Sequence, residues 1–350
     1  EPLVNGIVDY LRENNLKVFG PDKFCSKLEG SKIFTKKICD LEKIPTAEFK
    51  IFKNKDKCLD YLMHKDYPLV VKADGLAAGK GVYICNEYLE AKKAAEEIFD
   101  GKFGKADEIL IEDYLSGEEM SFFILYDNNS FKLFNTAQDH KRVFEGDKGK
   151  NTGGMGAYTP SRLNNPELEK KIINKIILPT LNYLKKENGI YIGFLYAGLM
   201  IKNNEPYLIE YNVRMGDPEC QTILPLLKND FVEVLQNCID GSLDKIELNW
   251  REEKSICIVL TSKGYPEKYQ KNILIDKLDQ FINTNSEYIF HAGTKIKNGK
   301  FYSNGGRVLN FVSINKSFIS ARNNALKLVK KLNWKSGHFR KDIGFKVINN

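Results

Sequence analysis

The order of apolar and polar positions predicts a chain that alternates between helices and strands from its first residues. Apolar residues between positions 3 and 11 recur at helical spacing, and the segment 17–19 before Gly20-Pro21 is typical of a short strand. A helix and a strand that have no sheet to join indicate the end of a larger unit. We therefore interpret residues 1–28 as the remnant of an N-terminal α/β domain whose first part is missing.

The next stretch of chain repeats this alternation. Ser31 is a candidate N-cap for a helix that ends before Ile44-Pro45. Apolar runs predict strands at 67–73, 82–85 and 109–111, and an amphipathic pattern predicts a helix at 89–99. Residues 46–115 are therefore expected to form a unit of mixed helix and strand.

The second half of the chain carries the same signals. Residues 121–135 predict a β-hairpin that turns at 127–129, and Pro166 opens a predicted helix over 166–186. Two strands follow at 193–201 and 207–212, joined by the polar turn 202–205, and a strand-rich unit from about 252 ends in a helix at 317–332. The pattern indicates an α/β or α+β fold with at least three units.

Composition and charge exclude several classes of protein. The 350 residues include 53 basic and 46 acidic side chains, a net charge of +7, and the lysines alternate with acids as on a solvated surface, so we expect no nucleic-acid groove. The longest apolar run, 189–201, is shorter than the roughly 20 residues of a membrane span, and no signal-peptide pattern is seen. Seven scattered cysteines without metal-site spacing predict reduced thiols in the cytoplasm.

The strongest local motif runs from Val71 to Val82 and combines small residues with two lysines. It is neither a Walker A loop nor a dinucleotide fingerprint, because three residues separate Gly75 from Gly79 and a strand follows where those motifs open a helix. Closely spaced backbone amides beside lysines favour phosphate binding. A glycine-rich hairpin over nucleotide phosphates is therefore predicted, and a plain flexible hairpin is the alternative.

A second motif occupies residues 208–219. Side chains alternate along a strand, so Glu210, Asn212 and Arg214 are predicted to project from one face. A carboxylate and an amide oxygen suit a hard cation that bridges phosphates, and the guanidinium suits an anionic substrate group. The alternative is a strand whose polar side faces solvent.

Two further segments carry weaker signals. Residues 138–142 supply two cations and a carboxylate, and the glycine-rich turn 151–158 can present amides to a phosphate. His140 invites a role as a general base, but a lone histidine is more often structural, and we do not place it in the site. The acidic segment 112–119 is ambiguous by composition alone.

Taken together, these segments resemble the glycinamide ribonucleotide synthetase (phosphoribosylamine–glycine ligase) family of the ATP-grasp superfamily. The resemblance covers essentially the whole chain. The segments that carry it lie at 30–34, 72–81, 111–119, 138–142, 151–158, 193–200, 209–219, 291–294, 304–308 and 340–344.

The resemblance implies an ATP-grasp fold with a truncated N-terminal α/β domain and a small strand-rich C-terminal domain. The implied domains are the remnant at 1–28, a main subdomain at 29–48 and 116–248, a lid subdomain at 49–115 and a C-terminal domain at 249–350. It implies that ATP phosphorylates glycine and that the amine of 5-phosphoribosylamine attacks the glycyl phosphate. The products are glycinamide ribonucleotide, ADP and phosphate, in de novo purine synthesis.

The resemblance also implies roles for individual residues. The ATP site would comprise two phosphate-binding lysines, a glycine-rich loop, an adenine-binding backbone and a ribose-binding acid: Lys32 and Lys72; Gly75, Gly79, Lys80 and Gly81; Glu112 to Leu115; and Glu119. Lys141 would reach the γ-phosphate, and Glu210 and Asn212 would bind Mg²⁺ or Mn²⁺. Arg214 and Asp217 would face glycine, with Gly153 and Gly154 near the phosphoribosyl phosphate.

Two departures and two open alternatives accompany this assignment. The strand at 195–200 offers no further metal ligand, so phosphate oxygens and water are expected to complete the coordination. A biotin-carboxylase-like or dipeptide-ligase-like enzyme, and a non-catalytic nucleotide-sensing or nucleic-acid-binding protein, are the alternatives. A monomer or weak dimer is expected, and a chain that begins within the first domain is expected to bind ATP well but turn over poorly.

Overall fold

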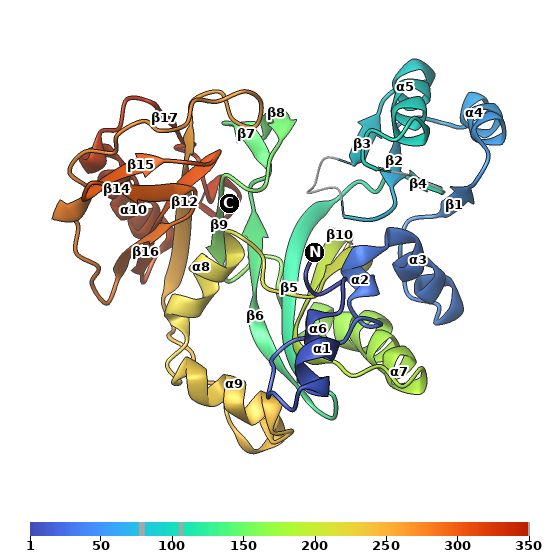
Figure 1. Ribbon diagram of the computed structural model, residues 1–350, viewed down its shortest axis with the longest axis horizontal. Coiled ribbons are helices and arrows are strands. Elements are labelled where there is room, and N and C mark those ends of the chain that lie inside the picture. Colours follow the sequence, from blue (N-terminus) through green and yellow to red (C-terminus); the bar gives the residue numbers. More distant parts are fainter. Residues whose placement is uncertain (77–80, 105–107, 349–350) are drawn as a thin grey trace.

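The computed structural model describes residues 1–76, 81–104 and 108–348, and Figure 1 shows a small sheet set beside a larger body. The small sheet is antiparallel in the order β1-β4-β2-β3. Two helices, α4 and α5, pack on it, and the alanines of α5 let its backbone approach the sheet closely. The bounds are β1 Phe49–Phe52, α4 Lys55–Met63, β2 Leu69–Ala73, β3 Val82–Cys85, α5 Tyr88–Phe99 and β4 Ile109–Asp113.

The large sheet has nine strands in the order β11-β10-β5-β6-β9-β12-β16-β13, with β17 beside β12. The pairing of β9 with β12 carries this sheet from the middle of the chain into its C-terminal part without a break. The bounds are β5 Glu118–Asp127, β6 Phe131–Asp139, β9 Gly156–Thr159, β10 Ile192–Lys202, β11 Glu205–Asn212, β12 Lys254–Ser262, β13 Glu287–His291, β16 Arg307–Asn315 and β17 Gly337–His338.

Alternating side chains of β5 build two different cores. Phe122 and Ile124 pack against one helical layer, whereas Phe123 and Leu125 pack against α9 on the other face, as a period of two requires. Helices therefore cover both faces of this end of the sheet (Figure 1). The helices are α1 Ile7–Glu13, α2 Lys27–Gly30, α3 Lys32–Leu41, α6 Pro166–Ile172, α7 Leu178–Lys186, α8 Glu219–Ile223 and α9 Phe231–Ile239.

The C-terminal part of the large sheet has its own core beneath α10, which contacts both β12 and β16. Two hairpins, β7–β8 and β14–β15, stand beside it. The remaining bounds are β7 Arg142–Phe144, β8 Lys148–Asn151, β14 Thr294–Lys297, β15 Lys300–Ser303, α10 Phe318–Leu332 and α11 Phe345–Ile348, with 3-10 turns at Leu224–Leu226, Leu243–Lys245 and Leu278–Gln280.

Most predicted elements are confirmed, and one prediction is wrong. Residues 17–19 form no strand, and Phe19 instead packs against Phe194 of β10. The predicted helix does extend over 166–186, and it contains a π-helical turn at Ile173–Ile177, just before Pro179, whose nitrogen has no hydrogen to donate. The hairpin at 127–129 and the strands that flank the turn 202–205 are as predicted.

The Asp-His-Lys-Arg motif contributes a structural histidine. The Gly344 N–H donates to Nε2 of buried His140 at 2.9 Å, so this ring nitrogen is an acceptor. Buried Arg340 pairs with Asp147 and Asp342 beside it, which ties the C-terminal segment to the β7–β8 hairpin. Within the described ranges, no helix is both long and apolar enough to cross a membrane.

Candidate active site

A buried ion pair joins two strands of the small sheet. Lys72 Nζ on β2 donates to Glu112 Oε2 on β4 at 2.8 Å, and each residue is only 5% exposed. Burial alone would raise the pKa of Glu112, but Lys72 and Lys36 outweigh it and hold that pKa below its usual value. The predicted phosphate lysine therefore lies against a carboxylate that fixes its position.

The first turn of α3 brings a second lysine to the same place. Ser31 Oγ accepts from the Phe34 N–H, which confirms the predicted N-cap, and also bonds the Asp74 carboxylate. Lys32 Nζ donates to the Gly75 carbonyl at 2.9 Å, where the chain leaves β2. Burial lowers the pKa of Lys32, and nearby Glu210 opposes that shift, so the lysine lies within the electrostatic reach of the predicted metal ligand.

The glycine-rich loop is described at its two ends. Gly75 has a φ of +89°, a region in which side chains are strained. The Ala73 N–H donates to the Gly81 carbonyl at 2.8 Å and closes the turn. The predicted phosphate-binding residues Gly79 and Lys80 lie outside the described residues.

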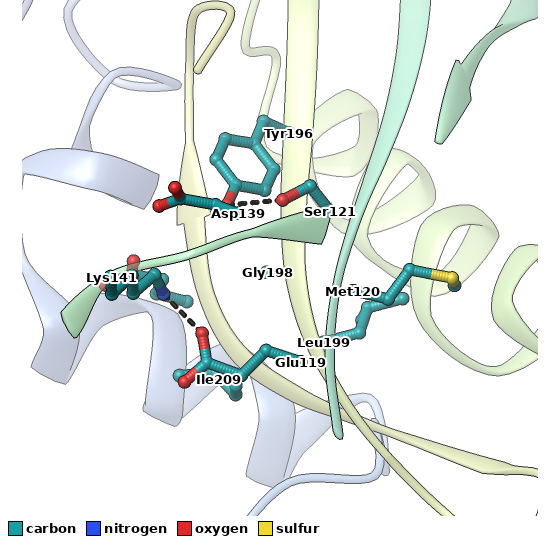
Figure 2. Close-up of a pocket in the computed structure, with 10 residues that line it drawn as sticks. Glu119, Met120, Ser121, Asp139, Lys141, Tyr196, Gly198, Leu199 and Ile209 are labelled. Carbon is teal, nitrogen blue, oxygen red and sulfur yellow. Dashed lines mark hydrogen bonds and ion pairs between the residues drawn. The ribbon is translucent and has the colours of Figure 1, made fainter. Parts of the chain in front are cut away.

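The metal strand β11 places Glu210 directly opposite Gly198 of β10. A Cβ at Gly198 would lie 3.3 Å from Glu210 Cγ, so the glycine leaves room for the glutamate side chain to lie across the sheet. Glu210 lines one pocket together with Glu119, Lys141 and Asp139 (Figure 2). The predicted metal, ribose and γ-phosphate residues therefore meet around one small space.

Lys141 and Glu119 face each other across this pocket. Their Nζ and Oε2 atoms are 2.5 Å apart, and Figure 2 marks this ion pair with a dashed line. Lys141 lowers the pKa of Glu119. Burial would lower the pKa of Lys141, but Glu119 and other surrounding acids raise it well above its usual value. Lys141 therefore stays cationic at neutral pH.

Asn212 and Arg214 are brought together by a turn and not by strand alternation. Strand β11 ends at Asn212, so the predicted common strand face extends only from Glu210 to Asn212. Arg214 Nη2 nevertheless donates to Asn212 Oδ1 at 3.0 Å and pairs with Glu29 at 2.8 Å. Glu29 is not among the residues that the sequence predicted for the site. Its position just before the Gly30-Ser31-Lys32 motif is the feature of the sequence that indicates a role for it.

A second cluster lies where the C-terminal part meets the rest of the site. Arg307 pairs with Asp217 Oδ2 at 2.8 Å and also donates to the carbonyl of Gly153. The Gly153 N–H in turn donates to the Tyr265 hydroxyl at 2.9 Å. The predicted substrate residues Asp217 and Gly153 are thus joined by an arginine from β16, for which the sequence suggested no role.

Position 154 requires a glycine, because the surrounding atoms leave no space for a side chain. Its φ is +111°, and a Cβ there would lie 2.5 Å from Pro218 and 2.8 Å from Asp139. Asp139 lines the pocket, and burial together with nearby Glu219 raises its pKa well above the usual value. Ser121 Oγ lies 2.9 Å from both Glu219 and the Tyr196 hydroxyl. These buried polar residues were also absent from the predicted site.

The donor set at β11 fits a divalent cation that is shared with a nucleotide. Glu210 and Asn212 offer hard oxygen donors, which Mg²⁺ and Mn²⁺ accept. Among the described residues no three His, Cys, Asp or Glu side chains gather as a self-sufficient metal site. Phosphate oxygens and water would therefore have to supply the remaining ligands.

The comparisons with known proteins agree with this geometry. Residues 30–220 match the phosphoribosylglycinamide synthetase ATP-grasp (A) domain, and residues 255–346 match the C domain of the same synthetase. Phosphoribosylamine–glycine ligase of Agrobacterium fabrum is 44% identical over 99% of this chain and 82% of its own length. The ligase of Haemophilus influenzae is 45% identical over 99% and 81%.

Solved structures extend the comparison to the fold. A Thermotoga maritima phosphoribosylamine–glycine ligase has a TM-score of 0.85 at 34% identity, over 93% of this chain and 81% of its own. Biotin carboxylase from Campylobacter jejuni has a TM-score of 0.69 at 14% identity, over 92% and 71%, which supports the fold alone. The chain belongs to the phosphoribosylglycinamide synthetase (phosphoribosylamine–glycine ligase) family and has the ATP-grasp fold of that family.

Proposed function

We propose that this chain is an ATP-dependent ligase that joins glycine to 5-phosphoribosylamine, through a glycyl phosphate, in de novo purine synthesis. The observation that carries the proposal is that Lys141 and Glu210 line one pocket, while Lys32 lies within electrostatic reach of both Glu210 and Lys72. Formation of an acyl phosphate needs neutralised charge more than a protein nucleophile, and this site supplies cations from three separate elements.

The residues divide into a nucleotide end and an acceptor end. Lys32 and Lys72 hold ATP phosphates beneath the loop 75–81, the backbone at 112–115 takes the adenine edge, and Glu119 takes the ribose. Lys141 leaves Glu119 when the nucleotide arrives and turns to the γ-phosphate. Glu210 and Asn212 would hold a divalent cation, for which we favour Mg²⁺, and the cation would supply neutralisation of phosphate charge.

At the acceptor end, Arg214 and Asp217 face glycine, and the turn at Gly153 and Gly154 faces the phosphoribosyl phosphate. The contacts of Arg307 with Asp217 and Gly153 support this division, because one guanidinium holds the two predicted subsites at a fixed separation. The amine nitrogen attacks the glycyl carbonyl carbon, the carbon–oxygen bond to phosphate breaks, and the amine loses a proton.

We further propose that the enzyme acts in the cytoplasm as a monomer or weak dimer, without nucleic-acid or membrane partners. The seven cysteines are unpaired and six of them are buried, which fits a reducing compartment. The domain boundaries that the resemblance implies also remain a proposal. They agree with the small sheet, which lies entirely within 49–115, whereas the large sheet runs past position 248.

The test is release of ADP from MgATP and glycine, with and without freshly generated 5-phosphoribosylamine. We expect release that requires both co-substrates. A biotin-carboxylase-like reaction would instead release ADP with bicarbonate and no glycine. ATP binding with no release under either condition would overturn the proposed reaction and leave a nucleotide-binding protein on this fold.

A further inference from the structure

Lys36 is a buried cation that the proposed mechanism does not use. It lies on α3 one turn after Lys32, is only 2% exposed, and makes contacts on three sides. Its Nζ lies 3.3 Å from Glu112 Oε1, 2.5 Å from Thr46 Oγ1 and 5.4 Å from the centre of the Phe49 ring. A lysine is costly to bury in this way, so a specific set of partners must hold it.

The first contact connects Lys36 to the nucleotide end of the site. Glu112 uses Oε2 for Lys72, while Oε1 is buried and forms no hydrogen bond of good geometry within the described part of the chain. Lys36 is therefore the charge that compensates Oε1. Without it, the carboxylate that fixes Lys72 could turn, and the position of the phosphate lysine would follow.

The second contact connects Lys36 to the metal strand. Thr46 accepts from Lys36 and donates its own proton to the Leu208 carbonyl at 2.6 Å. Backbone pairing supports this junction, because the Leu208 N–H donates to the Pro45 carbonyl at 2.8 Å. Leu208 lies on β11, two residues before Glu210. One ammonium group therefore contacts Glu112 of the small sheet directly and reaches the strand that carries the predicted metal ligands through Thr46.

We propose that Lys36 is a positioning residue that couples nucleotide binding at Lys72 to metal binding at Glu210, through Glu112 on one side and Thr46 on the other. The proposal rests on the proposed function for the identity of the ligands. It differs from a purely structural role because one arm of the contact ends on Lys72 and the other ends on the Leu208 carbonyl, two residues before Glu210. Loss of Lys36 should therefore weaken both ligands, whereas loss of the Thr46 hydroxyl should weaken mainly the metal arm.

The experiment measures the dissociation constant of ATP at several Mg²⁺ concentrations by equilibrium titration, together with thermal unfolding. Lys36→Met should raise the dissociation constant of ATP by about tenfold to a hundredfold, the range seen when a residue supporting a binding group is removed. Thr46→Val keeps every charge and should raise the half-saturating Mg²⁺ concentration about tenfold. Its effect on ATP affinity without Mg²⁺ should stay within about twofold.

Two matched variants control the measurement. Thr46→Ser retains the hydroxyl and should restore the wild-type Mg²⁺ dependence, and Lys37→Met removes an exposed neighbour of Lys36 on the same helix and should change neither constant. If both Lys36→Met and Thr46→Val bind ATP and Mg²⁺ as the wild type does and only their unfolding temperatures fall, the coupling is refuted. Should Lys36→Met fail to fold, Thr46→Val against Thr46→Ser decides alone.

This readout separates the proposal from the proposed function. Titration of ATP and Mg²⁺ does not require ligase turnover. A wild-type chain that binds MgATP but releases no ADP with glycine and 5-phosphoribosylamine would refute the reaction and leave the coupling measurable. A wild-type chain that catalyses the ligation, together with variants whose ATP and Mg²⁺ binding matches the wild type, would support the reaction and refute the coupling.

Discussion

The cluster around Glu112 at the nucleotide end and the acceptor end of the site hold their charges in opposite ways. In the cluster around Glu112, Lys36, Lys72 and Glu112 are all buried and satisfy one another within the protein. At the acceptor end, the Arg214 side chain is half exposed, as is that of Asp217, and both make ion pairs that water can reach. Buried charges interact strongly and are costly to move, whereas exposed pairs are weak and easily exchanged.

This difference indicates how each end would respond to its ligand. A buried network keeps Lys72, the proposed phosphate lysine, in place before the nucleotide arrives, which reduces the entropic cost of ordering the lysine side chain on binding. Arg214 and Asp217 are instead held by partners that a small anionic or cationic substrate can displace. The following predictions test whether the charged side chains are fixed at the nucleotide end and whether ion-pair partners can be displaced at the acceptor end.

The largest expected effect comes from the metal strand between the two ends. Glu210→Gln should lower kcat for ADP release by at least about a thousandfold, about 4 kcal/mol of transition-state stabilisation, because the developing phosphate charge loses its cation. Glu205→Gln, on the same strand but paired with surface lysines, is the control and should retain activity. Retained turnover in Glu210→Gln would remove the metal assignment.

The second effect separates the two ends by stability. Glu112→Gln removes the buried carboxylate that pairs with both Lys36 and Lys72, and should lower the free energy of unfolding by about 3 kcal/mol because two ammonium groups remain buried. Glu29→Gln, the matched change at the acceptor end, keeps an acceptor for the Val213 N–H and should cost less than about 1 kcal/mol. Urea unfolding of both variants measures the difference, and equal losses would contradict the comparison.

The third effect concerns specificity at the acceptor end. Arg307→Lys keeps the charge but loses the planar fork that contacts both Asp217 and Gly153. We expect the KM for 5-phosphoribosylamine to rise about tenfold, with the KM for ATP within about twofold of wild type. Lys300→Met, at an exposed position on β15, is the control. A rise in the KM for ATP instead would place Arg307 at the nucleotide end.

The smallest expected effect is a dependence of folding stability on pH, and it comes from His140, which lies outside both ends of the site. Burial lowers the pKa of His140, with Asp147 opposing and Arg340 and Lys346 reinforcing that shift. The unfolded chain takes up a proton near the ordinary histidine pKa of about 6.5, so the stability contributed by neutral His140 is present above that pH. It is lost progressively as the pH falls through 6.5 toward the lowered pKa of the folded state.

Thermal unfolding between pH 5 and pH 8 checks this window. His140→Gln retains a side-chain acceptor for the Gly344 N–H and should flatten the dependence, whereas His64→Gln, at an exposed helix end, should leave it unchanged. A profile of His140→Gln that follows the wild type would assign the pH dependence to other groups.

Much of the candidate site could be predicted from the sequence, because its residues lie in motifs with a physical meaning. The glycines at 75–81, the strand that carries Glu210 and Asn212, and the cap at Ser31 each depend on local spacing. Local spacing could not indicate that strand β11 ends before Arg214, nor that the helix opened by Pro166 contains a π-helical turn at Ile173–Ile177. These outcomes depend on which hydrogen-bond partners the folded chain provides.

The sequence by itself determined the family, the fold and the reaction, and it predicted the ligand-binding positions, since these predictions rest on contiguous motifs and on alternation along strands. Only the tertiary structure decided that Lys36, one of many helical lysines, is buried against Glu112, and that Arg307 reaches Asp217 from 90 positions along the chain. Burial and long-range pairing arise when separate elements pack together. The energy of a charge depends on those surroundings and not on its neighbours in sequence.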